Sequence, residues 1–132
     1  MKLNDLKIDA AKAEQGAFVG DIPDLGDLRL KVRGHDNVDA RRLRSKLVSA
    51  LPRSLRTDPK EQDRITARVL AETVLLGWEN LDGETYSKDR ALEIISDPDY
   101  APFRDGVVWA AVMVAERQTE NIKADAKNSP KS

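Results

Sequence analysis

LAETVLLGWENLDGETYSKDRALEIISDPDY, residues 70–100, is the stretch that decides how this chain folds. It begins with an almost continuous apolar run to Trp78, turns at Gly83 within a polar segment, and reaches Ser87, a residue type that caps helices. The pattern predicts that two helices meet here and that the apolar run belongs to the core. No side chains within the stretch are arranged for catalysis, so it predicts architecture rather than activity.

The segment before this junction predicts a long helix over residues 59–78. Its start is marked by Asp58-Pro59-Lys60-Glu61, which joins a capping Asp, a Pro at the first helical position and a Glu in the first turn. Apolar or small residues then recur three or four positions apart. They are Ile65, Val69, Thr73 and Leu76. Three other helices are expected at about residues 37–51, 88–96 and 101–122.

A β-hairpin is predicted over residues 16–33. Leu28, Leu30 and Val32 alternate with Arg29, Lys31 and Arg33, which is the period of a strand with one buried face. An isolated hairpin is only marginally stable in water, so this apolar face must lie on the helices or pair with another chain. We assign Leu28, Leu30 and Val32 to self-association as a hypothesis, because an unpaired strand edge can add to a neighbour's.

Together these elements predict an α+β, mainly α fold, with an N-terminal hairpin followed by about four helices. A chain of 132 residues fits one small domain, which we place at residues 16–123. Residues 1–15 are expected to form a flexible arm, and the polar residues 124–132 a disordered tail.

Composition excludes several classes of function. There are no cysteines, and His35 is the only histidine, so neither a thiolate nor a histidine metal cluster is expected. No phosphate-binding loop or nucleophile motif is present, and we predict a protein that is not an enzyme, with no catalytic, cofactor-binding or metal site. No segment approaches the ~20 apolar residues of a membrane helix, and no secretory signal is seen, which indicates a cytoplasmic protein without membrane contacts.

One basic segment could contact nucleic acid. It comprises Arg41, Arg42, Arg44, Lys46, Arg53 and Arg56. A helix carrying these residues would present a positive face to phosphates. The net charge of −1 and the lack of interleaved aromatic residues weigh against that role, and a solvated helix face explains the arginines equally well. Nucleic acid is therefore not the expected partner, and a small DNA-binding regulator stays as the alternative.

Apolar residues left over by the helical stripes are candidates for binding a partner protein. Trp78 and Trp109 each lie on an apolar helix face, where core packing is the first interpretation; an exposed Trp would instead be an anchor for a partner. The partner-binding hypothesis names Leu75 and Trp78 on the central helix and Val108, Trp109 and Val112 on the last helix.

Several motifs recur in a recognisable order. They are Leu28 to Gly34 followed by Asp36-Asn37, Leu75 to Gly83, Tyr86-Ser87 with Ala91-Leu92, and Asp97-Pro98. This order resembles the tail assembly chaperones of long-tailed bacteriophages and prophages, in which a tryptophan-containing turn precedes an [FY]-S/T helix start and a last helix. Lys88-Asp89 departs from that pattern, because relatives often carry Pro or Glu near this position.

The resemblance implies an assembly factor rather than an enzyme. Members of that family bind the tape measure protein, recruit tail tube subunits and are absent from the finished virion. They are made in a short and a longer form by a programmed frameshift; this chain resembles the short form, and Pro130-Lys131 fits a slippery codon pair. The implied location is the host bacterial cytoplasm. Homo-oligomerisation stays open, and so does a structural head–tail connector that remains in the virion.

Overall fold

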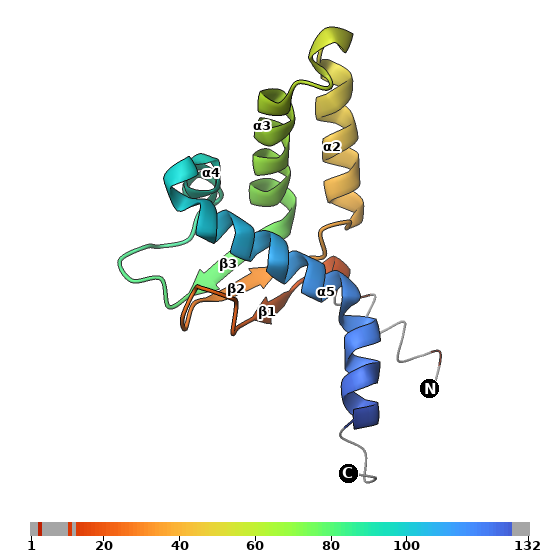
Figure 1. The fold of residues 1–132 in the computed structure, drawn as a ribbon, viewed down its shortest axis with the longest axis vertical. Helices are drawn as coiled ribbons and strands as arrows, with labels where there is room; N and C mark the ends of the chain where they lie inside the picture. The colour runs from red at the N-terminus through yellow and green to blue at the C-terminus, as the bar shows by residue number, and fades with distance from the viewer. Residues whose placement is uncertain (1–2, 4–10, 12, 128–132) are drawn as a thin grey trace.

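The computed structural model describes the backbone of residues 3, 11 and 13–127 and the burial of side chains as far as Glu116 (Figure 1). This part of the chain is mainly helical, with one small three-stranded antiparallel sheet, which confirms the predicted fold class in a single small domain. The elements are β1 (Ala17–Val19), β2 (Arg29–Val32), α2 (Val38–Ala50), a 3-10 turn (Arg53–Leu55), α3 (Pro59–Val69), a π-helical turn (Leu70–Val74), β3 (Leu75–Glu79), α4 (Lys88–Ser96), a second 3-10 turn (Pro98–Tyr100) and α5 (Ala101–Lys127).

The sheet has the order β1-β2-β3, so β2 is its central strand. β1 and β2 pair antiparallel as the predicted hairpin, and β2 also pairs with β3. The inward side chains of this hairpin, Leu28, Leu30 and Val32, are buried. This corrects their assignment to self-association, because side chains buried on a central strand offer no surface to a second copy.

The predicted α-helix over residues 59–78 is wrong from residue 70 onward. The α-helix ends at Val69, a single π-helical turn follows, and Leu75–Glu79 is a strand. A continuous apolar run does not distinguish a buried helix from a buried strand, since its periodicity fits both. Pairing with β2 decides for the strand, and Gly77 in the run lowers the helix propensity that would oppose it.

Asn37 joins the start of α2 to the π-helical turn. Its Oδ1 accepts from the Ala40 amide at 2.9 Å, which caps the helix, and its Nδ2 donates to the Thr73 carbonyl and to the Gly34 carbonyl at 2.9 Å each. Asn37 is only 2% exposed, so these bonds satisfy polar groups that water does not reach.

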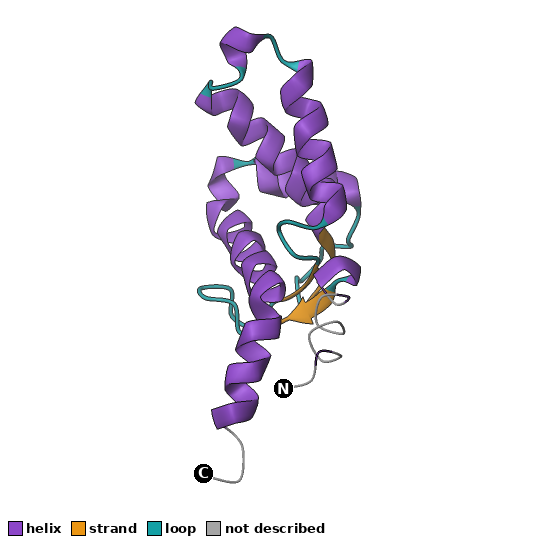
Figure 2. Cartoon of the chain, turned by 90° about the vertical axis from the view of Figure 1, so that its right-hand side faces the viewer, coloured by secondary structure: helices purple, strands orange, loops and turns teal. Residues whose placement is uncertain are grey.

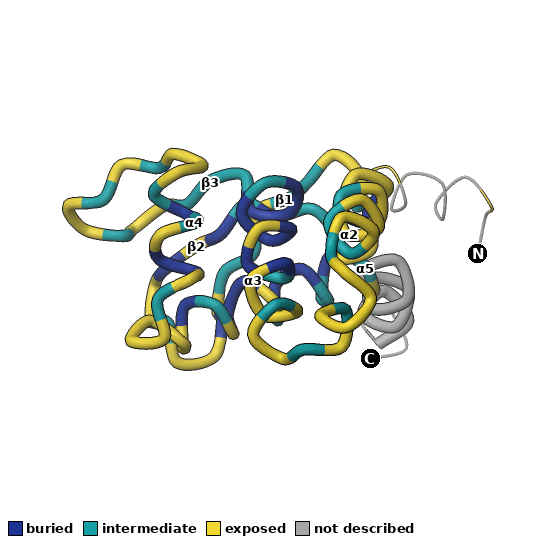
Figure 3. Tube along the Cα trace, turned by 90° about the horizontal axis from the view of Figure 1, so that it is seen from above, coloured by how far each residue is buried: buried dark blue, intermediate teal, exposed yellow. Residues whose placement is uncertain are grey.

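α2 and α3 stand side by side at one end of the molecule, and α5 crosses one face of the sheet (Figures 1 and 2). The core lies where the sheet, the π-helical turn, α4 and α5 meet. Its most completely buried large side chains include Leu30, Leu75, Ile95 and Val107. Buried segments accordingly gather in the middle of the molecule, whereas much of α2 is exposed (Figure 3).

The two ends of the domain differ from the predicted limits. Residues 13–15 of the predicted arm are helical, and the Ala13 carbonyl accepts from the Gly34 amide at 2.8 Å. At the other end α5 runs to Lys127, four residues beyond the predicted domain limit. The rest of the predicted tail, 128–132, and most of the arm lie outside the described residues. Among the helices that are described, none is both long and apolar enough to cross a membrane.

Candidate partner-binding surface

One of the five predicted partner-binding residues belongs to the core, and a second packs against the core. Leu75 is 0% exposed on β3, which corrects its assignment, because a buried side chain cannot contact a partner. Trp78 is half-buried, and its ring meets the rings of Tyr86 and Phe103 edge-on, with centroids 5.0 and 5.9 Å apart. Its Nε1 donates to the Glu84 carbonyl at 2.9 Å, so the indole holds the loop after β3 in place.

The other three predicted residues lie together on α5. Val108 is 38% exposed, and Trp109 and Val112 are half-buried. Positions 108 and 112 are four apart and 109 and 112 are three apart, so the three side chains are neighbours on one side of the helix. α5 thus buries Val107, Ala110 and Ala111 in the core and leaves a second, partly exposed apolar strip.

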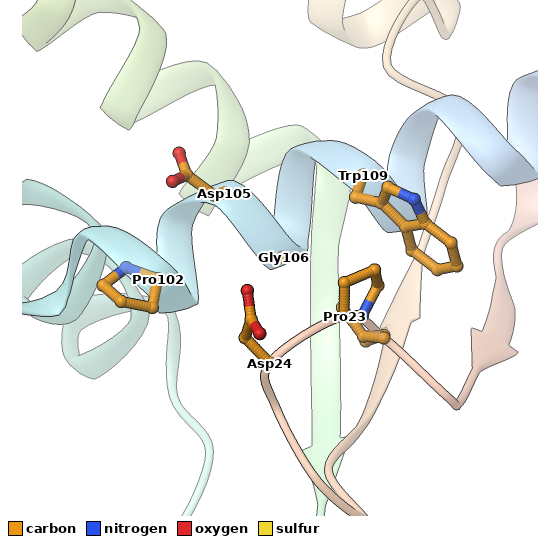
Figure 4. A pocket seen from close by; sticks show the side chains of 7 residues that line it. Pro23, Asp24, Pro102, Asp105, Gly106 and Trp109 are labelled. Atoms are coloured by element: carbon orange, nitrogen blue, oxygen red, sulfur yellow. The ribbon is translucent and has the colours of Figure 1, made fainter.

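A hollow of about 220 Å³ adjoins this strip. It is lined by Ile22, Pro23, Asp24, Pro102, Asp105, Gly106 and Trp109. Pro102 and Trp109 lie along α5 on either side of Gly106, and Pro23 and Asp24 face them from the loop between β1 and β2 (Figure 4). We name Pro23, Pro102, Val108, Trp109 and Val112 together the Trp109 face. The two prolines were missed in the sequence, where Pro23 signals only a turn and Pro102 only a helix start.

Gly106 allows the β1–β2 loop to lie against α5. A Cβ atom built on Gly106 would lie 2.3 Å from Leu25 Cδ1 and 3.2 Å from Ile22 Cγ2. The close approach explains why a residue with low helix propensity occupies the interior of α5. This glycine in an otherwise apolar helical pattern was the available sequence signal for the contact.

Gly106→Val is expected to lower the free energy of unfolding by about 1–3 kcal/mol, because the branched side chain overpacks the contact with Ile22 and Leu25. Gly106→Ala should cost less than about 1 kcal/mol, since the Leu25 methyl can move and alanine favours the helix. Urea denaturation of both variants measures the difference. A Gly106→Val protein as stable as the wild type would contradict the close packing of Ile22 and Leu25 against Gly106.

A second hollow of about 350 Å³ lies on the other side of the same loop. It is lined by Asp24, Leu25, Leu28, Asn80, Leu81, Glu84, Arg90, Ile94, Tyr100 and Phe103. Glu84 and Arg90 line this hollow and form a bidentate salt bridge. Arg90 Nη2 donates to Glu84 Oε1 at 2.7 Å, and Arg90 Nε donates to Glu84 Oε2 at 3.0 Å. This hydrogen bonding lowers the pKa of the Glu84 carboxyl and raises the pKa of the Arg90 guanidinium. The pair fixes the loop between β3 and α4.

The Glu84–Arg90 pair predicts an acid-sensitive contribution to stability. Because the pKa of Glu84 is lower in the folded protein, its contribution is complete above the ordinary value of 4.5 and is lost as the pH falls through the folded value. Glu84→Gln should therefore lower stability at about pH 7 and flatten its decline below about pH 4.5. Urea denaturation across this range tests the slope, with Glu93→Gln as the control at the weaker Arg90 contact of 3.3 Å. If stability declined with falling pH as steeply in Glu84→Gln as in the wild type, the stabilising role of the Glu84–Arg90 pair would be contradicted.

The basic segment divides into two groups. Arg56 is half-buried and donates to the Leu51 carbonyl at 3.1 Å, and Arg44 donates to Thr66 Oγ1 at 3.2 Å, so both have contacts within the fold. Arg41, Arg42 and Lys46 are exposed on α2, and Arg53 is exposed in the turn that follows. These four exposed residues are the part of the basic segment that could contact phosphates.

His35 is exposed, and its backbone amide donates to the Ala111 carbonyl at 3.3 Å. Within the described residues, no three His, Asp or Glu side chains are grouped closely enough to hold a metal ion. The arrangement that stands out chemically is the Trp109 face, an apolar surface next to a hollow of side-chain size.

Residues 34–128 match a family model described as YdaY prophage protein. The match begins at the turn before α2 and includes every later element of the fold, so it covers most of the chain. No curated protein and no solved structure matches the sequence. The chain therefore belongs to the YdaY prophage protein family.

Proposed function

We propose that this prophage protein is a tail assembly chaperone, which binds the tape measure protein and recruits tail tube subunits during tail morphogenesis. Membership of a prophage family supports a phage-related role. The finer assignment is supported by the resemblance of residues 28–37 and 75–98 to tail assembly chaperones. In this role the protein acts in the host cytoplasm, needs no catalytic residue or cofactor, and leaves before the virion is complete.

The observation that carries this proposal is the Trp109 face. Its strip Val108, Trp109 and Val112 follows a helix, and Pro23 and Pro102 border the hollow beside it. A tape measure protein is long and largely helical, so its apolar stripes need cover before the tube assembles. A helix that lays its apolar face on such a surface buries one or two anchors per copy, and many weak contacts along one chain add up to strong binding.

Trp109→Ala is expected to weaken binding to a tape measure fragment from the same prophage by about 30-fold or more, because a buried Trp anchor is commonly worth 2 kcal/mol or more. Co-purification and titration of the fragment measure this. Tyr100→Ala is the matched control, since Tyr100 is an aromatic residue 48% exposed outside the Trp109 face. A folded Trp109→Ala protein that binds the fragment with unchanged affinity would contradict the proposal.

Two further observations separate the chaperone from a structural connector. Mass spectrometry of purified particles should find the tape measure protein and not this chain, whereas a head–tail connector would be present. The gene neighbourhood should place a tube protein gene upstream and a long tape measure gene downstream. A frameshifted longer form would require a slippery sequence near the codons for Pro130 and Lys131.

DNA binding is the second candidate, and the exposed group Arg41, Arg42, Lys46 and Arg53 favours it. Phosphate contacts of this kind release counterions, so binding would weaken steeply with salt. A salt-dependent shift of duplex DNA that is lost in Arg41→Ala/Arg42→Ala would support this candidate. The same variant should leave binding of a tape measure fragment unchanged if the chaperone proposal is right.

A further inference from the structure

Carboxylates surround the Trp109 face. Asp24 and Asp105 line its hollow and are exposed, and Glu116 is exposed further along α5. Asp105, Trp109, Val112 and Glu116 are spaced by four, three and four residues, so on an α-helix they form one stripe. The apolar strip is thus bounded by an acidic residue at each end and by Asp24 across the hollow.

Among the residues that the structure describes, no basic side chain lines the hollow. The residues that line the hollow include two carboxylates and no Lys or Arg. Arg104, the basic residue of α5 whose side chain the structure describes, is bound to Asp63 at 2.9 Å. Within the part of the chain that the structure describes, neither Asp24 nor Asp105 takes part in a salt bridge. The charged side chains that line the hollow are therefore negative, although the chain as a whole is almost neutral.

The backbone holds Asp24 in an unusual conformation at this place. Its φ is +66°, in the left-handed region that residues other than Gly seldom adopt and that Asp and Asn tolerate best. Ile22 and Leu25 of the same loop lie against Gly106 of α5, and Asp24 between them lines the hollow. Asn is the substitution that removes the charge and keeps this backbone conformation.

The hollow suits a side chain better than a free ligand. Its volume of about 220 Å³ is below the roughly 300–1,000 Å³ typical of small-molecule sites. An aliphatic side chain of a partner helix can enter between Pro23 and Trp109, while polar residues one turn away meet the carboxylates. Charge complementarity then requires those polar residues to be cationic.

We propose that the Trp109 face binds an amphipathic helical segment whose apolar residues are flanked by Lys or Arg. This rests on the proposed function, in which the tape measure protein supplies such segments. The carboxylates select the segment and raise the rate of encounter, and the apolar strip provides most of the affinity. A chaperone of this kind would cover basic apolar stretches of the tape measure protein and pass over acidic ones.

Two labelled synthetic peptides test the selection. Both have about 18 residues, or five helical turns, and an identical Leu and Ile face; one carries Lys at its polar positions and the other Glu. Fluorescence anisotropy with the full chain should give at least about 10-fold tighter binding of the Lys peptide at low salt and a smaller preference at about 0.5 M salt. Asp24→Asn/Asp105→Asn should reduce the preference to less than about 3-fold without loss of folding. Asp82→Asn, which removes an exposed carboxylate in the loop between β3 and α4, is the matched control and should keep the preference.

Equal binding of the two peptides would overturn the inference, and so would a Lys preference that the double variant leaves intact. α2 is itself a cationic helix, so a second copy is a competing occupant. A dimer in sedimentation that Asp24→Asn/Asp105→Asn dissociates would assign the face to self-association and overturn the inference. If the tape measure fragment did not bind, the proposed function would be wrong. The inference about the peptides would still stand, because the peptide preference is measured without that fragment.

Discussion

Asn37→Ala is expected to lower the free energy of unfolding by about 2–4 kcal/mol. The substitution removes the cap of α2, which costs about 1 kcal/mol, and leaves the buried Thr73 carbonyl without its donor, which costs about 1–3 kcal/mol more. The effect is large for a single polar residue because Asn37 ties together two elements 36 positions apart in the chain. Urea denaturation followed by circular dichroism measures it.

Asn37→Asp separates the two parts of this effect. It keeps an acceptor for the Ala40 amide, so the cap survives, but it loses the donations to Gly34 and Thr73. Its cost should therefore come from the π-helical turn rather than from α2. Hydrogen exchange can locate the loss, because amides of the π-helical turn and β3 should lose protection before those of α2. An Asn37→Ala protein within about 0.5 kcal/mol of the wild type would contradict the bridging role.

Leu75→Ala is expected to lower the free energy of unfolding by about 2–5 kcal/mol, the usual range for removing a buried Leu. Leu75 is the first residue of β3, is 0% exposed, and its carbonyl accepts from the Tyr86 hydroxyl at 2.9 Å. The cavity would lie between the sheet and the helices, where the main chain on both sides is fixed. Thermal and urea unfolding both measure the loss.

Val108→Ala is the matched control for this prediction. Val108 is 38% exposed on α5, so its truncation should change stability by less than about 0.5–1 kcal/mol. The two variants should have the reverse order of effects on binding. Val108→Ala should weaken binding of a tape measure fragment, whereas a Leu75→Ala protein that still folds should bind the fragment with unchanged affinity. A Leu75→Ala protein of wild-type stability would mean that Leu75 is not the core residue described above.

Local signals in the sequence were sufficient for several elements. Ser87 accepts from the Arg90 amide at 3.0 Å and begins α4 where its residue type and position predict a cap. The alternation of residues 28–33 predicts the strand β2. Its apolar face is buried within the fold, which is one of the two possibilities expected for a hairpin; the other was pairing with a second chain. Caps and period-2 patterns depend on neighbours in the chain, so they can be predicted without the tertiary structure.

The candidate site was predicted only in part. Val108, Trp109 and Val112 follow from the width of the apolar pattern on one helix. Pro23, Asp24 and their hollow do not, because they meet α5 across more than 75 positions of sequence, and a single sequence carries no signal of that contact. The two tryptophans are equivalent by pattern, and both are half-buried against the core. Their neighbours differ, because Trp78 packs on Tyr86 and Phe103, whereas Trp109 lines the hollow.

Local sequence patterns predict the mainly helical class, the hairpin, the cap of α4 and the apolar strip of α5, because each depends on residues a few positions apart. Only the tertiary structure decided the state of residues 70–79, where an apolar run compatible with a helix becomes a π-helical turn and a strand. The physical reason is that pairing with β2 and burial under α4 and α5 outweigh a weak local helix preference. The same long-range packing leaves the Trp109 face partly exposed and places Asp24 and Asp105 at the hollow beside it.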